Sequence, residues 1–272
     1  MKDEFDNFFV SPLILHPFID HSPLMILITG SAGRIGQAVV RELNSQGRPL
    51  RGFDLMPTPG IKDSLVGNIS DTEAVCQAAR GVQAIIHLAA IPDDDDFLTK
   101  LLPNNIVGAY NVMEAARLAG VKRVVLASSG QVVWWQRFSG PLPITADVPP
   151  TPRGWYAAGK LFLEGAGRAY AEAHGLSVIA ARLGWCPRDQ AHVEELARTD
   201  WGPDVYLSPR DAGRFFTCAV TASANIHFAV VYACSRPLRQ TVYDLEPARQ
   251  LLGFEPMDTW PEGIEEVLPR KS

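Results

Sequence analysis

Short apolar runs rich in β-branched residues alternate with longer helical patterns from Met25 onward. This alternation is typical of βαβ units, in which consecutive strands run parallel and a helix connects them. We expect strands at 25–29, 49–53, 62–66, 83–88, 122–127 and 177–182, and helices at 34–46, 71–79, 98–119 and 152–174. The chain is therefore predicted to form a parallel α/β sheet, and ligands of such sheets gather at the carboxyl ends of the strands.

The pattern becomes irregular after Arg182. There we expect only a helix near 209–221, a strand near 227–233 and a helix near 244–252. We predict a Rossmann-like, doubly wound domain at 25–182 and a small C-terminal substrate cap at 183–272, interleaved as one compact unit. We expect residues 1–24 to be an N-terminal extension, either a native arm or the product of an upstream start codon. Its acidic beginning and its prolines do not fit a signal peptide.

Two local features can be predicted more closely. The helix at 152–174 is expected to begin with Thr151 as its N-cap and Pro152 at the first helical position. The acidic run Asp93 to Asp96 is expected to form a solvated loop.

Composition argues against several classes of protein. The chain has 272 residues, is 47% hydrophobic and 20% charged, and carries a formal net charge of −5, which argues against a nucleic-acid partner. No apolar run is long enough to cross a membrane. The four cysteines are far apart and lack the paired spacing of metal ligands, so we expect no metal site, reduced thiols and a cytoplasmic location.

A glycine-rich turn follows the first predicted strand, in the segment Met25-Ile-Leu-Ile-Thr-Gly30-Ser-Ala-Gly33-Arg34-Ile35-Gly36. Glycine is needed where a backbone turns tightly, where it approaches a pyrophosphate, and where a helix packs closely on a strand. The N-terminus of the following helix points at the anion. The segment therefore predicts a dinucleotide site that includes Arg34 and Ile35.

Asp54 ends the second predicted strand, 18 residues after Gly36. A carboxylate at this place accepts hydrogen bonds from the ribose hydroxyls of the adenosine. A 2′-phosphate would meet a like charge there, and no lysine or arginine follows within 55–60 to receive it. The sequence therefore favours NAD over NADP.

Tyr156 and Lys160 lie four residues apart in a predicted helix and so project from one face, while Ser128 and Ser129 end the fifth predicted strand. A phenol titrates near 10, so a base that acts at neutral pH needs its pKa lowered by about three units, or about 4 kcal/mol. One ammonium at about 4 Å supplies an energy of this order at an effective dielectric of about 20. We predict Tyr156 as the base, Lys160 as the cation that favours its ionised form, and Ser129 as the residue that holds the reacting oxygen.

These motifs resemble those of the extended short-chain dehydrogenases. The resemblance covers the chain from about Met25 to its end, and rests on TGSAGRIG at 29–36, FDL at 53–55, HLAA at 87–90, NIVGAYNVMEAAR at 105–117, KRVVLASS at 122–129 and YAAGK at 156–160. Within this superfamily the chain is most similar to the uronate dehydrogenases, through LSPRD at 207–211 and VVYA at 230–233.

The resemblance implies NAD-dependent oxidation of the C1 hydroxyl of a cyclic hexuronic acid to an aldarolactone. It implies that Asn68 and Ile69 flank the adenine and that the remaining cofactor contacts come from Leu88, Ala89, Ala90 and Asn105. It also implies a homodimer in which the helices at 98–119 and 152–174 pair across a twofold axis.

The chain departs from the uronate dehydrogenases at several polar positions. Gly130-Gln131 replaces Asn-His, Pro92 replaces a serine, and Trp185 replaces another small serine. Tryptophan stacks on the apolar face of a sugar or encloses a larger apolar group, and Trp134, Trp135, Trp155 and Trp185 all fall in segments expected to border the pocket. We predict that substrate contacts Ser129, Gly130, Gln131, Trp185 and Arg188, with Arg210 as the second candidate for a substrate carboxylate.

Three functions remain open at this point. The first is the oxidation of a sugar or sugar acid with release of NADH. The second is a nucleotide-sugar epimerase or dehydratase that reduces NAD only transiently. The third is a non-catalytic dinucleotide sensor, which would not need Tyr156 and Lys160.

Overall fold

The structure is a computed structural model that describes residues 24–267. The predicted N-terminal extension therefore lies outside the described residues, apart from Leu24.

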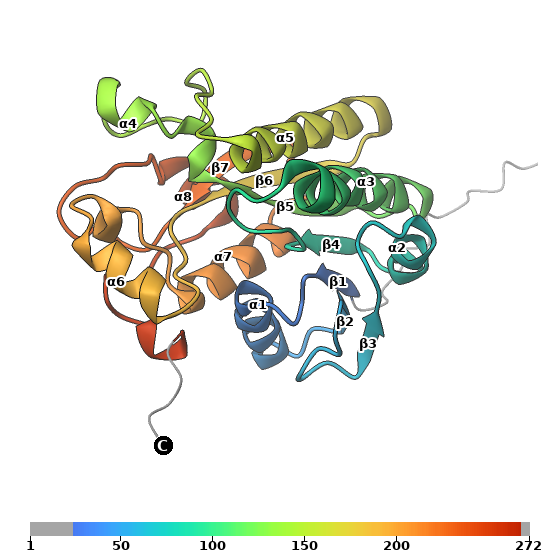
Figure 1. The fold of residues 1–272 in the computed structure, drawn as a ribbon. Coiled ribbons are helices and arrows are strands. Elements are labelled where there is room, and N and C mark those ends of the chain that lie inside the picture. Colours follow the sequence, from blue (N-terminus) through green and yellow to red (C-terminus); the bar gives the residue numbers. More distant parts are fainter. Residues whose placement is uncertain (1–23, 268–272) are drawn as a thin grey trace, which may run out of the picture.

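A seven-stranded, all-parallel sheet forms the centre of the molecule, with the strand order β3-β2-β1-β4-β5-β6-β7 (Figure 1). The strands are β1 (Ile26–Thr29), β2 (Leu50–Asp54), β3 (Asp63–Val66), β4 (Ala84–His87), β5 (Arg123–Ser129), β6 (Ser177–Leu183) and β7 (Phe228–Ala233). The order reverses between β1 and β4, which is where doubly wound sheets open a crevice for ligands. The structure thus confirms the predicted Rossmann-like α/β fold.

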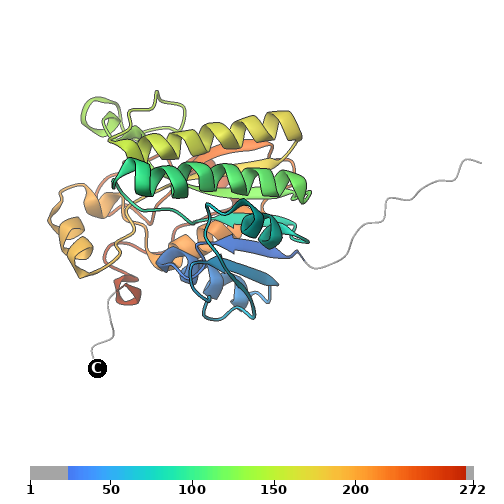
Figure 2. The same ribbon diagram turned by 45° about the vertical axis from the view of Figure 1, so that its right-hand side comes forward.

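Helices cover both faces of the sheet because successive strand residues point to opposite sides. Ile26 and Ile28 pack with α1 (Arg34–Ser45), α7 (Pro209–Thr221) and α8 (Glu246–Leu252). Leu27 points to the other face, which the remaining large helices cover. These are α2 (Thr72–Ala79), η1 (Phe97–Val107), α3 (Gly108–Leu118) and α5 (Trp155–His174). Figure 2 shows α3 and α5 lying side by side along the sheet.

The smaller elements follow the carboxyl ends of β5 and β6. They are the 3₁₀ turn η2 (Gly130–Val133), α4 (Gln136–Ser139), α6 (Gln190–Arg198) and η3 (Gly202–Asp204). A last 3₁₀ turn, η4 (Ile264–Glu266), ends the described chain. In Figure 1, α4 and α6 extend beyond one edge of the sheet. These elements supply much of the wall of the pocket described below.

The helix boundaries differ from prediction in two places. Helix α5 begins at Trp155 with Gly154 as N-cap, so the predicted start at Thr151 and Pro152 is wrong. The backbone N–H of Thr151 instead donates to Val132 O, which ties the approach to the helix to η2. The stretch expected as one α-helix at 98–119 begins as the π-helix η1 with Pro103 inside it. Proline has no N–H to donate and crowds the preceding turn, so this part of the helix is wound more widely.

Candidate functional site

A cavity of about 860 Å³ opens at the carboxyl ends of the central strands. It extends from the glycine turn after β1, past Ser129, Tyr156 and Lys160, to Trp185 and Arg188. The structure therefore brings the predicted cofactor loop, catalytic residues and substrate residues to one pocket.

The glycine turn can be built only from glycine. Gly30 has φ +71°, and a Cβ on it would lie 2.6 Å from Ala89 N. A Cβ on Gly36 would lie 2.2 Å from Gly30 O, so the start of α1 packs directly on the turn. Gly33 is the N-cap of α1 and provides no side-chain cap, which leaves the first N–H groups of the helix available to an anion. Gly30, Gly33, Arg34, Ile35 and Gly36 all line the cavity, an arrangement that fits a dinucleotide pyrophosphate.

Asp54 lies at the end of β2, beside this turn. Its Oδ2 accepts a hydrogen bond from Ala32 N at 2.9 Å, and its Oδ1 accepts one from Leu55 N at 2.7 Å. No arginine or lysine among residues 24–267 forms an ion pair with it. Asp54 is thus held in place with its charge uncompensated, which suits two ribose hydroxyls and disfavours a phosphate.

The other predicted cofactor residues fall into two groups. Leu88 and Ala90 line the cavity, and Ala89 packs its backbone against Gly30. Asn68, Ile69 and Asn105 lie outside the cavity lining. The Asn68 side chain accepts hydrogen bonds from Ser70, Ile69 is buried, and the Asn105 amide bonds both the N–H and the carbonyl of Ile91. The Asn105 side chain therefore fixes the loop after β4, and both its oxygen and its nitrogen are already hydrogen-bonded to Ile91.

Ser129, Tyr156 and Lys160 line the same part of the cavity, as their spacing predicted. Lys160 is buried and donates a hydrogen bond from Nζ to Ala127 O at 2.8 Å, and Nζ lies 5.5 Å from the centroid of the Tyr156 ring. Ser129 Oγ accepts a hydrogen bond from Gln131 N at 3.1 Å, which caps η2. The strand end and the helix face thus hold the three side chains in place before any substrate arrives.

The pKa of Tyr156 shifts opposite to the predicted direction. Burial raises it above the ordinary value, Asp93 raises it further, and only the neighbouring Ser129 and Arg188 lower it. Burial also lowers the pKa of Lys160 to about 8. The prediction that Lys160 supplies most of the depression of the Tyr156 pKa is therefore wrong, because burial outweighs the groups that lower this pKa and Lys160 is not among them.

A buried ion pair fixes α5 to the sheet one turn beyond Lys160. Glu164 accepts hydrogen bonds from Arg182 Nε and Nη2, both at 2.9 Å, and from Ser128 Oγ at 2.5 Å. Arg182 also donates from Nη1 to Ala146 O at 3.1 Å. Helix α5, strands β5 and β6, and the loop before α5 are thus connected through one charged centre beside the catalytic residues.

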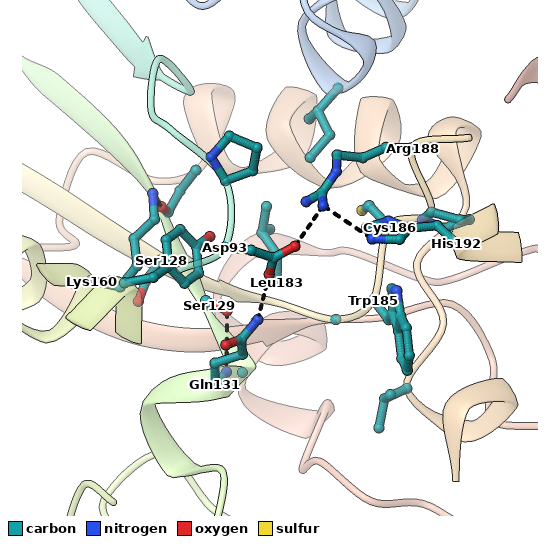
Figure 3. Close-up of a pocket in the computed structure, with 18 of the residues that line it drawn as sticks. Asp93, Ser128, Ser129, Gln131, Lys160, Leu183, Trp185, Cys186, Arg188 and His192 are labelled. Carbon is teal, nitrogen blue, oxygen red and sulfur yellow. Dashed lines mark hydrogen bonds and ion pairs between the residues drawn. The ribbon is translucent and has the colours of Figure 1, made fainter. Parts of the chain in front are cut away.

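Asp93 organises the substrate side of the pocket (Figure 3). Its carboxylate forms an ion pair with Arg188 at 2.6 Å and accepts a hydrogen bond from Gln131 Nε2 at 2.9 Å. The neighbouring Asp94 also lines the cavity and accepts a hydrogen bond from Tyr156 N at 2.7 Å. The expectation that Asp93 to Asp96 form a solvated loop is therefore wrong for Asp93, which is half-buried and paired, whereas Asp94 to Asp96 are exposed. The position of Asp93 and Asp94 in the loop that follows β4, at the carboxyl edge of the sheet, was the available signal.

Of the four tryptophans expected at the pocket, two line it. These two are Trp134 and Trp185. Trp201, which was not predicted, also lines the pocket, and its ring centroid lies 5.4 Å from that of Trp185. Trp135 and Trp155 lie outside the lining, 54% and 65% exposed, and pack against Phe138 and Phe97.

Arg188 lines the pocket, but Arg210 does not. Arg210 forms ion pairs with Asp258 and Glu265, so its assignment as a second substrate ligand is wrong. Gly130 and Gln131 line the pocket as predicted.

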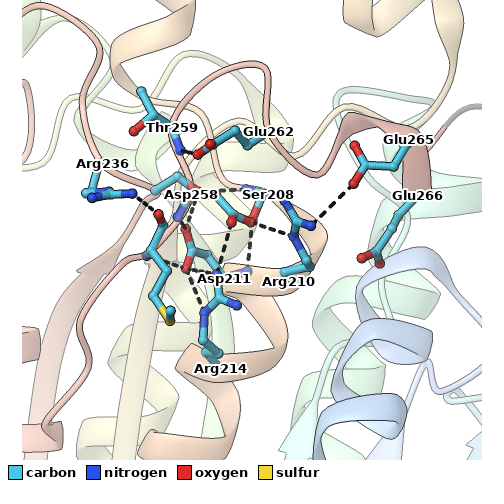
Figure 4. A network of polar contacts seen from close by, with 12 residues as sticks. Ser208, Arg210, Asp211, Arg214, Arg236, Asp258, Thr259, Glu262, Glu265 and Glu266 are labelled. Carbon is cyan, nitrogen blue, oxygen red and sulfur yellow. Dashed lines mark hydrogen bonds and ion pairs between the residues drawn. The ribbon is translucent and has the colours of Figure 1, made fainter.

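A buried polar network joins the C-terminal segment to α7 (Figure 4). Asp211 is fully buried and accepts hydrogen bonds from Arg214, Ser235, Met257 N and Asp258 N. Beyond this network, Arg34 Nη1 donates to Val267 O at 2.8 Å. A residue of the predicted cofactor loop is thereby connected to the last described part of the chain.

The described residues contain no group of three or more His, Cys, Asp or Glu side chains arranged to hold a metal ion. None of the helices in residues 24–267 is long and apolar enough to cross a membrane. Cys76, Cys186, Cys218 and Cys234 are all free thiols.

Comparison with known proteins agrees with this geometry. Residues 26–185 match the sequence profile described as the NAD dependent epimerase/dehydratase family. The chain is 28% identical over 250 residues to an NAD-dependent glucose-6-phosphate dehydrogenase of Haloferax volcanii, covering 86% of this chain and 93% of the relative. It is 33% identical over 218 residues to an L-arabinose 1-dehydrogenase (NAD(P)(+)) of the same organism, covering 73% and 83%.

Among solved structures, a mutated uronate dehydrogenase is similar with a TM-score of 0.74 and 27% sequence identity. The similarity covers 92% of this chain and 88% of that chain.

Proposed function

Because the chain belongs to the NAD dependent epimerase/dehydratase family and uses NAD as its cofactor, we propose that it oxidises a hydroxyl of a sugar or sugar acid and releases NADH. The observation that carries this proposal is the placement of Ser129, Tyr156 and Lys160 on the wall of the cavity that also holds the glycine turn. Relatives named for glucose 6-phosphate, arabinose and uronate support a sugar as the substrate.

When bound, NAD⁺ supplies the hydride acceptor and a positive charge. The chain's own residues handle the proton and the orientation of the substrate. Ser129 donates a hydrogen bond to the reacting oxygen, and Tyr156 accepts the proton as that oxygen becomes a carbonyl. Lys160 stabilises the ionised phenol together with the cofactor charge, which opposes the desolvation that raises the Tyr156 pKa.

The test is a spectrophotometric assay of the purified protein with NAD and a panel of aldoses, uronates and sugar phosphates. We expect NADH to accumulate with at least one substrate, and Tyr156→Phe to lower kcat by about 10²–10⁴-fold, the usual contribution of a general base. Tyr170→Phe on the same helix is the matched control, because the Tyr170 hydroxyl donates to Glu114, away from the cavity.

Two results would count against the proposal. Substrate consumption without NADH would favour the epimerase or dehydratase alternative. An unchanged response to NAD in Tyr156→Phe, with no turnover of any sugar, would favour a sensor.

We further propose a cytoplasmic homodimer with residues 183–272 as the substrate cap. Exposed apolar side chains on η1, α3 and α5 support pairing through these helices, with Leu98, Tyr110 and Phe162 being 71%, 53% and 44% exposed. Light scattering coupled to gel filtration measures the mass, and a monomer at micromolar concentration would contradict the dimer.

A further inference from the structure

Two arginines lie on the pocket wall around Trp134. Arg137 in α4 places its guanidinium carbon 3.4 Å from the ring centroid of Trp134 and 3.4 Å from that of Trp201. Arg153, in the approach to α5, places its guanidinium carbon 4.4 Å from the Trp134 centroid. Both arginines and both tryptophans line the cavity that contains Tyr156. Cation–π contacts therefore hold two positive charges on one wall of the pocket.

Among the residues that the structure describes, neither guanidinium has a partner of opposite charge. Within residues 24–267, the side chains of Arg137 and Arg153 form no hydrogen bond and no ion pair. Arg137 Nε and Nη2 are buried and unbonded in this part of the chain. Buried polar groups in folded proteins are nearly always paired, and a charged donor without an acceptor is unfavourable. This wall thus provides donors for a ligand that brings its own acceptors.

Arg188, the third arginine of the substrate side, is different. Asp93 neutralises it at 2.6 Å, and His192 Nε2 lies 3.0 Å from its Nη2. A substrate carboxylate beside Arg188 would meet the like charge of Asp93. The only other acidic side chain in the pocket lining, apart from Asp94, is the exposed Glu195, which pairs with neither Arg137 nor Arg153.

We propose that Arg137 and Arg153 bind the phosphate group of a phosphorylated sugar, and that the natural substrate is therefore a sugar phosphate rather than a uronate or a neutral sugar. This inference rests on the proposed function. Two guanidinium groups match a phosphate dianion in charge, and their planar donor edges match its oxygens. Trp134, Trp185 and Trp201 supply flat apolar surfaces for the sugar ring.

Calorimetric titration of the protein loaded with NADH tests the site independently of turnover, because the reduced cofactor cannot accept a hydride from the sugar. The ligands are D-glucose 6-phosphate, D-ribose 5-phosphate, D-glucuronate, D-glucose and inorganic phosphate. We expect at least one sugar phosphate to bind at least tenfold more tightly than glucuronate and glucose. Arg153→Gln and Arg137→Gln should each weaken that binding by about 10–100-fold, the usual effect of losing a charge-assisted hydrogen bond. Arg198→Gln on the exposed face of α6 is the matched control.

Circular dichroism and thermal melting check that Arg137→Gln still folds. If Arg137→Gln does not fold, Arg153→Gln still tests the site, because Arg153 is exposed. Comparable binding of glucuronate or glucose, no binding of either sugar phosphate, or unchanged sugar-phosphate affinity in a folded Arg153→Gln would overturn the inference.

Kinetics separate the two proposals. Tight sugar-phosphate binding without NADH formation would contradict the dehydrogenase function and leave the phosphate site standing. NADH formation with neutral sugars, and no preference for their phosphates, would contradict the phosphate site and leave the dehydrogenase function standing. In Arg153→Gln we expect the ratio of kcat/KM for phosphorylated over unphosphorylated sugar to fall by about tenfold or more.

Discussion

Tyr156 lies between opposing influences on its pKa. Burial and Asp93 favour the neutral phenol, whereas Ser129 and Arg188 favour the ionised form. A phenol with a raised pKa is protonated at neutral pH and cannot accept a proton from a hydroxyl. The cofactor charge and the Lys160 ammonium therefore decide how much of the base is available.

The pH profile of sugar oxidation should follow from this balance. We expect kcat/KM to fall as the pH falls, because the free phenolate is progressively protonated. In Asp93→Asn, loss of the carboxylate lowers the Tyr156 pKa and frees the Arg188 charge, so the acid side of the profile should move to lower pH. Asp95→Asn, in the same loop but outside the cavity lining, is the control. A shift to higher pH in Asp93→Asn would contradict this electrostatic account.

Asp54 gives a second prediction at the scale of single residues. Asp54→Asn keeps an oxygen acceptor for Ala32 N and removes the charge that opposes a 2′-phosphate. We expect the ratio of kcat/KM for NADP over NAD to rise about tenfold or more, since a hydrogen bond to a charged group contributes about 1.5–3 kcal/mol. Steady-state kinetics with both cofactors measure this ratio. An unchanged ratio would show that Asp54 does not select the cofactor.

At the scale of elements, the attachment of α5 to the sheet depends on an ion pair that is almost completely buried. The side chains of Glu164 and Arg182 are 6% and 5% exposed, and two hydrogen bonds join them. Breaking such a pair leaves one charge buried without compensation.

We expect Glu164→Gln to lower the free energy of unfolding by about 3–5 kcal/mol. The double variant Glu164→Gln with Arg182→Met should recover a large part of that loss, because no buried charge remains. Denaturant unfolding measures both, with the exposed Glu172→Gln expected within about 0.5 kcal/mol of the wild type. Equal losses in the single and double variants would mean that packing, and not charge, holds α5 in place.

The elements of the fold were largely predictable because apolar periodicity is a local property. Every strand lies within a residue or two of its expected range, and Ser129 and Leu183, which end β5 and β6, line the pocket. The start of α5 was not predictable from Thr151 and Pro152, because the backbone of Thr151 is bonded to Val132 in another element. Helix α6 was not predicted, because it is short and buries only Val193 and Leu196, which leaves little apolar periodicity to detect.

The site was predictable where chemistry depends on spacing along the chain, and less so where segments meet in space. The glycine turn, Ser129, Tyr156 and Lys160 belong to the first kind. The pairing of Asp93 with Arg188, and the contact of Arg137 with Trp201, join residues far apart in the sequence. No local pattern in a single sequence contains those contacts.

The whole molecule is closed by the return of its C-terminal segment to α1 and α7. Asp211 holds this segment through hydrogen bonds from Met257 N and Asp258 N at 2.9 and 3.0 Å. The carboxylate has no exposure to solvent, so its loss cannot be compensated by water.

We expect Asp211→Ala to destabilise the protein by about 3–5 kcal/mol, because it removes the shorter of the two ion pairs of Arg214 and leaves the buried donors of Ser235, Met257 and Asp258 without an acceptor. Hydrogen exchange should show the amides of 257–267 exchanging faster, with weaker binding of NAD as the contact of Arg34 with Val267 is lost. Glu255→Gln, at an exposed ion pair with Arg249, serves as the comparison. Unchanged protection of 257–267 would show that other contacts hold the segment.

The bond from Arg34 to Val267 also bears on how the protein is best handled in the laboratory. An affinity tag or fluorescent fusion joined shortly after Val267 would begin close to Arg34, in the loop predicted to receive the pyrophosphate. The first described strand, β1, begins at the opposite edge of the sheet from that loop. Kinetic constants measured with a tag joined shortly after Val267 therefore call for comparison with protein from which the tag has been removed.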